Sequence, residues 1–252
     1  MLKVQLHTHV KGDPIDRIPH TAKDLIKEAA RLNYDVLAIT CHRKRIFTKS
    51  LERFAKKHNI LLPPGIEFEI NGKHILGINV DKNITKVTSF EKLAAYRKSH
   101  PNCLIIAPHP FFPTKECLQK DLINNIQLFD AIENSFFYTK SKNYNDQALA
   151  LAKRWRKPVI STADCHILKH LDIAFTEVDA RKTASSVVKA IKAGKLKNSH
   201  QPSSYFKLGK IFTSMLCNIS NSSLAQSVRP FCNISYMLQS NKTHLIHAKI
   251  HS

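Results

Sequence analysis

The chain has 252 residues, a length that α/β barrels commonly reach as one domain. Lysine and arginine together number 39 against 19 for aspartate and glutamate, which gives a net charge of +20 at pH 7. Such a charge favours anionic partners, phosphate or nucleic acid, through long-range attraction, although a lysine-rich solvated surface has the same composition. No apolar run reaches the roughly 18 residues that a transmembrane helix needs, so the composition predicts no membrane protein.

The amino terminus and the cysteines bear on where the protein is found. A charged segment followed by an apolar one does not open the chain, so we expect no signal peptide. The six cysteines include no Cys-x-x-Cys pair, which argues against a zinc ribbon. We therefore expect reduced thiols in a cytoplasmic protein.

Strand and helix patterns alternate along the first 200 residues. In chain order, the sequence predicts a strand at 2–6, a helix from the N-cap Thr21 to about Leu32, strands at 36–40 and 64–68, an apolar segment at 74–77, a helix at 90–99, a strand at 104–107, a helix at 118–129, a strand at 131–133, a helix at 142–156, strands at 159–161 and 173–178, and a helix at 185–193 that Gly194 ends. Alternation at this spacing implies parallel βα units. With about seven strand positions, a slightly distorted or incomplete α/β barrel fits better than an open sheet.

The composition changes after about Gln201. Serine, asparagine and histidine become frequent, and no acidic residue follows Asp179, so that 180–252 carries 11 basic residues and no acid. We therefore divide the chain into a hydrolase domain at 1–200 and a basic, acid-free tail at 201–252, in which only 203–216 has the pattern of a short amphipathic helix. The tail is open to three interpretations: an arm for a partner or nucleic acid, an appendage without fixed structure, or an accident of the reading frame.

Histidine and acidic side chains accompany nearly every predicted strand. These residues are His7, His9, His42, Glu67, His74, His109, Asp164 and His166. In (β/α) barrels the catalytic groups lie at the carboxyl ends of several strands, which converge in space although they are distant in sequence. Imidazoles combined with carboxylates are typical ligands for Zn, Mn or Fe. The pattern therefore predicts a hydrolase that binds more than one metal ion.

Two pairs among these residues have a spacing that suits a shared metal ion. His7 and His9 are two positions apart at a strand end, and so are Asp164 and His166. Alternation along a strand puts both side chains of each pair on one face. A single His-x-His pair is weak evidence, because two strand-end histidines are ordinary. Repetition of the pattern on several strands is what predicts a common site.

As a set, these motifs resemble those of the PHP family, named for polymerase and histidinol phosphatase. The matching segments are His7-x-His9, Asp13, Thr40-Cys41-His42, Gly65-Ile66-Glu67, His74-Ile75-Leu76-Gly77, His109-Pro110 and Asp164-x-His166, which span about residues 1–180. The resemblance implies a distorted (β/α)7 TIM-like barrel, the PHP domain, that binds two to three divalent ions of Zn, Mn or Fe. It places His7, His9, Glu67 and Asp164 at one metal, Glu67, His74 and His109 at a second that Glu67 bridges, and Asp13, His42 and His166 at a third.

The chain departs from the family's pattern at two points. Cys41 stands where an aspartate usually precedes the histidine, and we expect an inert buried thiol there rather than an additional ligand. The acid after His-x-His often lies in a Ser-Asp-Gly turn, whereas this chain offers both Asp13 and Asp16. Of the two we prefer Asp13 as the ligand.

The chemistry expected of such a site is phosphoester hydrolysis. A cluster of divalent ions lowers the pKa of a bound water to about 7 and neutralises charge on phosphoryl oxygens, so a metal-bridged hydroxide is the expected nucleophile. We expect Glu67, Asp164 and His166 to be catalytic. Arg43 and Arg45 closely follow His42 and are candidates for binding the substrate phosphate, although a solvated basic loop is an equal alternative.

We predict a phosphatase that acts on a small phosphorylated metabolite, similar to histidinol phosphatase. One alternative is a nuclease or nucleotide phosphoesterase, which the basic surface and tail favour. The sequence shows no basic motif interleaved with aromatic residues for base stacking, which weakens that alternative. Another is a non-catalytic barrel that binds RNA or protein, which would have no need of a complete ligand set. The oligomeric state is open at this point.

Overall fold

The computed structural model describes residues 1–202 and Gly209. The predicted helix at 203–216 and the rest of the tail lie outside the described residues, apart from Gly209. In chain order the elements are β1 (Leu2–Gln5), α1 (Ala22–Arg31), β2 (Val36–Leu37), α2 (Lys49–Lys57), β3 (Gly65–Ile70), β4 (Lys73–Ile78), η1 (Lys82–Lys86), α3 (Phe90–Ser99), β5 (Leu104–Ala107), α4 (Lys120–Asn124), η2 (Ile126–Leu128), β6 (Ala131–Ser135), α5 (Asn145–Arg154), β7 (Val159–Thr162), η3 (Leu168–His170), β8 (Ala174–Val178), α6 (Ala184–Lys192) and β9 (Leu196–His200).

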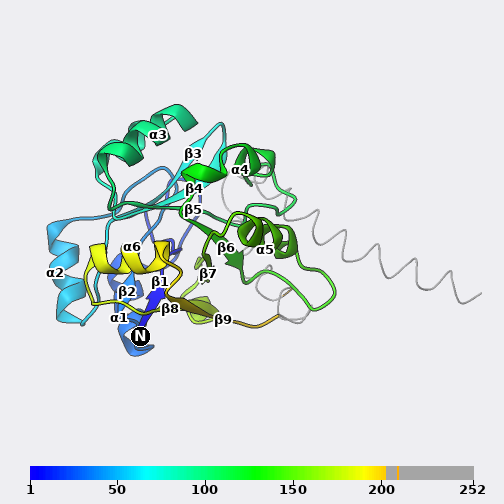
Figure 1. The fold of residues 1–252 in the computed structure, drawn as a ribbon. Helices are drawn as coiled ribbons and strands as arrows, with labels where there is room; N and C mark the ends of the chain where they lie inside the picture. Colours follow the sequence, from blue (N-terminus) through cyan, green and yellow to red (C-terminus); the bar gives the residue numbers. More distant parts are fainter. Residues whose placement is uncertain (203–208, 210–252) are drawn as a thin grey trace, which may run out of the picture.

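The described strands form two mixed sheets (Figure 1). One has the order β2-β1-β8-β9 and the other the order β3-β4-β5-β6-β7. β1 is parallel to β2, and β5, β6 and β7 are parallel to one another, whereas β8 and β4 run antiparallel to their neighbours. The expected parallel arrangement therefore holds only in part. The hairpin between β3 and β4 turns at Asn71 and Gly72, which both have the positive φ that a type I′ turn requires.

Two isolated bridges connect the sheets at the motif residues. Thr8 pairs with Cys165 in parallel, and His42 pairs with Glu67 in parallel. Because Thr8 lies between the two histidines of His-x-His, and Cys165 lies between Asp164 and His166, this pairing sets the two motifs side by side. Among the described residues, the regular strands do not close into one barrel. The backbone bridges between the two sheets are those beside the motif residues, at Thr8 and at His42.

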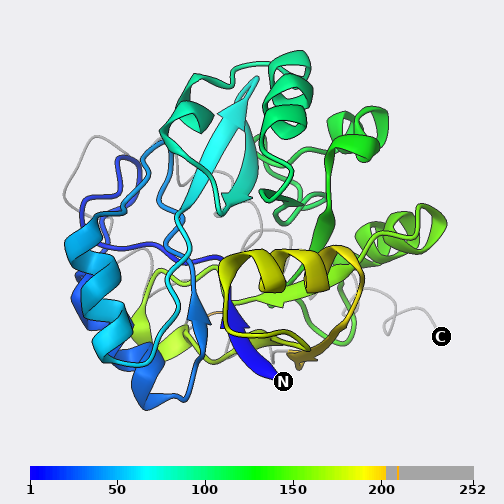
Figure 2. The same ribbon diagram turned by 60° about the vertical axis from the view of Figure 1, so that its left-hand side comes forward.

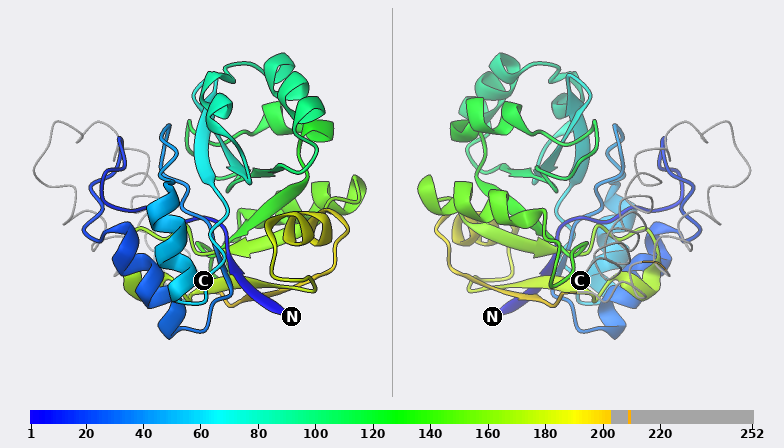
Figure 3. Two further views of the ribbon diagram at one scale, coloured as in Figure 1. Left: turned by 90° about the vertical axis from the view of Figure 1, so that its left-hand side faces the viewer. Right: turned by 90° about the vertical axis from the view of Figure 1, so that its right-hand side faces the viewer.

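Apolar side chains of both sheets fill the space between them. Val4 of β1 lies in one buried cluster with Leu76 of β4, Ile106 of β5 and Ile160 of β7, and α6 adds Val187. The remaining helices lie on the outside (Figures 2 and 3): α3 and α5 pack on the outer face of the five-stranded sheet, and α1 and α2 pack beside β2. The core thus anchors the strands whose ends form the site. No described helix has the length and apolar content to cross a bilayer.

Helix caps explain where the sequence prediction was accurate. α1, α3 and α6 begin where Thr21, Ser89 and Thr183 accept a backbone N–H at the N-cap, as the sequence suggested for the first. The predicted helix at 118–129 is instead two short pieces, α4 and η2, separated at Asn125. The predicted helix at 142–156 begins only at Asn145.

Apart from the short 3-10 helices η1 and η3, one α-helix and one strand have no counterpart in the sequence prediction. α2 buries only Leu51 and Ala55, so its apolar periodicity is weak. The sequence feature that marks the start of this helix is its N-cap, Thr48. β9 has the polar sequence Leu-Lys-Asn-Ser-His and is a strand because it pairs with β8 along its whole length. Both elements are stabilised by contacts with distant parts of the chain, which the local sequence pattern does not reveal.

Candidate metal centre

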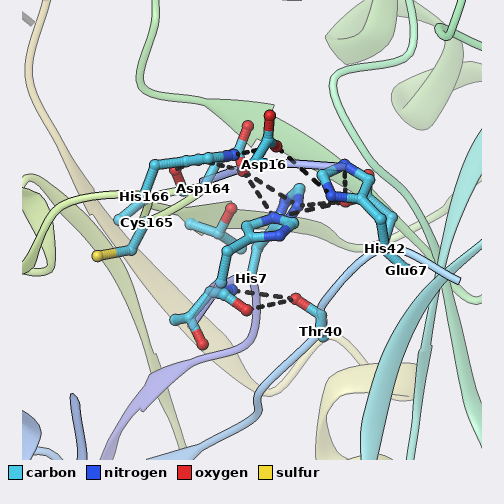
Figure 4. A network of polar contacts seen from close by, with 12 residues as sticks. His7, Asp16, Thr40, His42, Glu67, Asp164, Cys165 and His166 are labelled. Carbon is cyan, nitrogen blue, oxygen red and sulfur yellow. Dashed lines mark hydrogen bonds and ion pairs between the residues drawn. The ribbon is translucent and has the colours of Figure 1, made fainter. Parts of the chain in front are cut away.

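His7, Glu67 and Asp164 direct donor atoms toward one another (Figure 4), and His9 joins them. His7 Nε2 lies 3.3 Å from Glu67 Oε2 and 3.2 Å from Asp164 Oδ1. His9 Nε2 lies 3.4 Å from the same Glu67 oxygen and 3.3 Å from the same Asp164 oxygen. Both histidines follow β1, Glu67 lies in β3, and Asp164 follows β7. The parallel bridge between Thr8 and Cys165 holds the two pairs in this register.

The spacing of these four atoms fits a metal ion. Donors placed tetrahedrally at about 2.0–2.1 Å from zinc are roughly 3.3–3.4 Å from one another. His9 Nε2, Glu67 Oε1 and Asp164 Oδ1 are buried and have no hydrogen-bond partner in the described part of the chain. Buried polar atoms are normally paired. A cation bound among the four donors would satisfy His9 Nε2 and Asp164 Oδ1, so these residues fit the metal that the sequence predicts. Glu67 Oε1 points away from this group.

Glu67 presents its other oxygen to a second group of histidines. Glu67 Oε1 lies 2.9 Å from His74 Nδ1 and 3.6 Å from His109 Nε2. His42 Nε2 lies 3.2 Å from Oε2, on the side of the first group. Each carboxylate oxygen thus faces different donors, which is the arrangement of a residue that bridges two metal ions.

Asp13 and Asp16 occupy different positions around the third group. Asp13 Oδ1 accepts the backbone N–H groups of Ile15 and Asp16, and Oδ2 accepts that of His42 at 3.0 Å and the ring of His9 at 2.9 Å. Asp16 Oδ2 instead lies 3.0 Å from His166 Nε2 and 3.5 Å from His42 Nδ1. Both oxygens of Asp13 also lie 3.1 Å from His42 Nδ1, but they accept several N–H groups of the chain itself. Asp16 differs in that it faces His166 as well as His42 (Figure 4).

The sequence and the fold can now be compared with known proteins. Residues 142–196 match the sequence family described as PHP-associated. A two-domain protein from Bacteroides vulgatus, described as containing a predicted PHP-like metal-dependent phosphoesterase, superposes with a TM-score of 0.63 and 16% identity, over 85% of this chain and 69% of that one. One segment of the chain thus matches a PHP-associated sequence family, and the fold is similar to that of a protein with a PHP-like domain.

Other solved structures share this fold. PsfC from Pseudomonas syringae superposes with a TM-score of 0.59 and 14% identity, over 88% of this chain and 99% of that one. Endonuclease Q, in complex with a 27-mer duplex that has an abasic lesion at the active site, superposes with a TM-score of 0.55 and 17% identity, over 80% of this chain and 60% of that one. No curated protein matches the sequence.

Histidines of the candidate metal centre are surrounded by carboxylates, which changes their affinity for protons. Burial alone lowers the pKa of His7, but Asp164, Glu133 and Glu67 outweigh it and raise that pKa well above the ordinary value. Burial also opposes protonation of His166, whereas Asp164 and Asp16 raise its pKa to about 10. In turn, the pKa of Glu67 is lowered well below its usual range, because the nearby histidines outweigh its burial.

The metal affinity of this site should therefore rise with pH. Metal ligation requires neutral imidazoles, and histidines with raised pKa values still hold protons near neutrality, so an incoming ion must displace them. We expect Mn²⁺ or Zn²⁺ to bind more tightly at pH 8 than at pH 6, with release of protons. Calorimetric titration in buffers of different ionisation enthalpy measures both quantities. Binding that is independent of pH, with no proton release, would contradict the expectation.

The other residues that the sequence analysis singled out lie at the edge of the candidate metal centre. Cys41 is fully buried, and burial raises the pKa of its thiol to about 12, which makes it unreactive. Arg43 donates from Nε and Nη2 to Glu69 at 2.8 Å, and Arg45 donates to the carbonyl of Val80. Both guanidinium groups thus have partners within the chain, and a phosphate-binding role for either stays a prediction.

Sequence reasoning overlooked one residue beside the candidate metal centre, Glu133 of β6. Its side chain is fully buried and accepts the ring N–H of His7 at 2.8 Å. The predicted strand at 131–133 contained this glutamate, but no motif marks it. The signal available was a lone acidic residue inside an otherwise apolar strand, since an unpaired charge is rarely buried.

Proposed function

We propose that this protein is a metal-dependent phosphoester hydrolase that acts on a small phosphorylated metabolite. The observation that supports this most is Glu67, whose two oxygens face two groups of histidines. When bound, two or three divalent ions supply a water with a pKa of about 7 and neutralise charge on phosphoryl oxygens. His7, His9, Glu67 and Asp164 would hold one ion, Glu67, His74 and His109 a second, and His42, His166 and an aspartate a third.

The chain's own residues suggest where a substrate would approach. The side chains of His7 and His9 are fully buried, whereas Asp164 and Asp16 are 25% and 27% exposed and His166 is 15% exposed. The buried histidines and Glu67 would exclude solvent from the inner donor atoms. On this exposed side the two carboxylates would hold metal, and His166 would be the residue nearest to an incoming phosphate.

We also infer that the two sheets are halves of the distorted (β/α)7 TIM-like barrel. Three observations support this: the bridges at Thr8 and His42 link the sheets, the cluster around Val4 fills the interior between them, and the site lies at one end of both. In such barrels the functional groups lie at the carboxyl ends of the strands.

Asp16, rather than Asp13, is the aspartate that we now propose for the third ion. Asp16→Asn should lower the bound metal by about one equivalent and leave the unfolding temperature of the metal-free protein nearly unchanged. Asp13→Asn should destabilise the metal-free protein, because a buried acceptor of several N–H groups is lost, which typically costs about 1–3 kcal/mol. Elemental analysis and thermal unfolding of both variants separate the two roles, and the reverse pattern would restore Asp13 as the ligand.

The proposal is tested with a panel of substrates. Metal-free protein is reconstituted separately with Mn, Zn and Fe and assayed on phosphomonoesters, including histidinol phosphate, and on nucleotides and DNA. We expect hydrolysis of a small phosphomonoester that depends on added metal. Activity that is absent from every substrate, in protein that has bound metal, would favour a non-catalytic binding role.

A nuclease is the second candidate, because the chain carries +20 and shares its fold with endonuclease Q. Preferential hydrolysis of DNA over small phosphoesters in the same panel would support it. The oligomeric state, which neither candidate specifies, follows from the same preparations by light scattering.

The domain boundary near residue 200 gives a further prediction. A chain that ends at residue 202 should fold and keep its hydrolysis of small phosphoesters, because every proposed ligand precedes it. If the tail binds nucleic acid, its removal should weaken binding to polyanions and flatten the salt dependence, since fewer counterions are displaced. Binding to single-stranded DNA at several salt concentrations measures this. Loss of folding on truncation would show that the tail belongs to the core.

A further inference from the structure

Glu133 joins three strand ends through one buried carboxylate. Its Oε1 accepts the ring N–H of His7 at 2.8 Å and also the hydroxyl of Thr162. Its Oε2 accepts the backbone N–H of His109 at 2.6 Å. His7 follows β1, His109 follows β5 and Thr162 ends β7, whereas Glu133 lies in β6 between the last two strands. The glutamate is thus an internal connection among residues that surround the site.

The contact with His7 determines which ring nitrogen is free. When Nδ1 carries the proton and donates it to Glu133, the lone pair of Nε2 faces Glu67 and Asp164, 3.3 Å and 3.2 Å away. The other tautomer would set a lone pair of Nδ1 against the Glu133 carboxylate, which is repulsive. A carboxylate behind a histidine fixes the tautomer, the ring orientation and the basicity of the ligating nitrogen.

The contact with His109 acts on the backbone. His109 has φ of +29°, in a region that residues other than glycine rarely adopt, and it also precedes Pro110. Such a conformation persists only where surrounding interactions hold it. The hydrogen bond from the His109 N–H to Glu133 is one of these interactions. It therefore helps to hold the His109 ring in place, with Nε2 3.6 Å from Glu67 Oε1.

Asp13 makes the same pair of contacts on the opposite side. It accepts the ring Nδ1 of His9 at 2.9 Å and the backbone N–H of His42 at 3.0 Å. Each histidine of His-x-His therefore has a buried carboxylate behind it, and each of these carboxylates also holds the backbone of a histidine on another strand. Because the same pair of contacts occurs at both Glu133 and Asp13, we infer that the contacts of Glu133 help to arrange the site.

We propose that Glu133 is a positioning residue that prepares His7 for one metal ion and His109 for the next, without facing either ion itself. The proposal rests on the metal site of the proposed function. It predicts that Glu133 governs metal affinity at two positions at once. A residue that only supports the fold would alter stability and leave metal affinity as it was.

The test compares Glu133→Gln, Glu133→Asp and the control Asp130→Asn in the full chain. A glutamine at position 133 keeps the size of the side chain but turns an NH₂ group toward one of its three hydrogen-bond donors, His7, His109 or Thr162. An aspartate keeps the negative charge but is too short to reach both His7 and His109. Asp130 immediately precedes the same strand, and its 8% exposed carboxylate accepts from Arg97 at 2.8 Å and from the backbone of Ile105, away from the site. It therefore reports what the loss of a largely buried carboxylate does to the fold alone.

Titration of metal-free protein with Mn²⁺ is the main measurement, with thermal unfolding beside it. We expect Glu133→Gln to weaken binding about 10- to 100-fold, in the range known for outer partners of ligating histidines, and Glu133→Asp to weaken it less. Asp130→Asn should lower the unfolding temperature with unchanged Mn²⁺ affinity. Wild-type affinity in either Glu133 variant that folds would overturn the proposal.

A measurement on the wild-type protein does not depend on any variant. Long-range ¹H–¹⁵N spectra of the zinc-loaded protein should show His7 protonated at Nδ1, and protonation at Nε2 would overturn the proposal. Hydrolysis is assayed separately. Protein that binds Mn²⁺ through a Glu133-dependent site but hydrolyses no phosphoester would refute the proposed function alone, whereas an active protein with Glu133-independent affinity would refute this inference alone.

Discussion

Glu67→Gln should remove most of the hydrolytic activity and the capacity for more than one metal ion. Both oxygens of Glu67 face histidine nitrogens, at 2.9 Å for His74 and at 3.2–3.4 Å for His42, His7 and His9. An amide has a single neutral acceptor oxygen and an NH₂ group that binds no cation. The loss in kcat/KM should therefore exceed the roughly 10- to 100-fold that removal of an outer partner costs. Steady-state kinetics and elemental analysis of the same preparation measure both effects.

His166→Ala is the matched comparison for Glu67→Gln. His166 contacts Asp16 and Asp164 at the exposed side of the site and does not approach the second group of histidines. We expect it to lose less activity than Glu67→Gln and about one equivalent of metal. Equal and small losses in the two variants would show that Glu67 does not bridge two ions. Circular dichroism of each variant checks that the chain has folded.

Removal of metal should produce the largest change in stability. An ion that binds the folded chain and not the unfolded one stabilises it by about 4 kcal/mol when free metal is about 1,000 times Kd. For a domain of this size, each kcal/mol corresponds to roughly 2–4 °C in Tm, so chelation should lower Tm by roughly 8–16 °C. Purified protein should contain two to three equivalents of transition metal.

Recovery after chelation distinguishes this effect from damage to the protein. Adding back Mn²⁺ or Zn²⁺ should restore Tm and hydrolysis together, whereas Mg²⁺, which prefers an all-oxygen shell, should restore neither fully. A protein that carries no metal as purified, takes up none on reconstitution and unfolds at the same temperature with or without chelator would refute the metal centre.

Local signals in the sequence were enough to place most helices and strands. Thr21 marks the start of α1 because its hydroxyl caps the first turn, and the apolar residues at 104–107 form β5 because they are buried on both faces. The sequence analysis missed β9, whose polar residues become a strand only through their pairing with β8. It also missed the antiparallel hairpin of β3 and β4, although Asn71-Gly72 is a recognisable turn.

The sequence by itself determined the donor types of the site and their attachment to strand ends. His7, His9, Glu67, Asp164 and the other predicted ligands are brought together as the motif spacing suggested, because alternation along a strand is a local property. Only the tertiary structure decided which acid faces which histidine. Asp13 and Asp16 lie in one loop, and their contacts differ because Asp13 accepts the backbone N–H of His42, 29 residues further along the chain, whereas Asp16 faces His166. The role of Glu133 could not be inferred from local sequence either, because its hydrogen-bond partners lie on or next to β1, β5 and β7. A buried carboxylate needs such donors, and only the fold brings them to it.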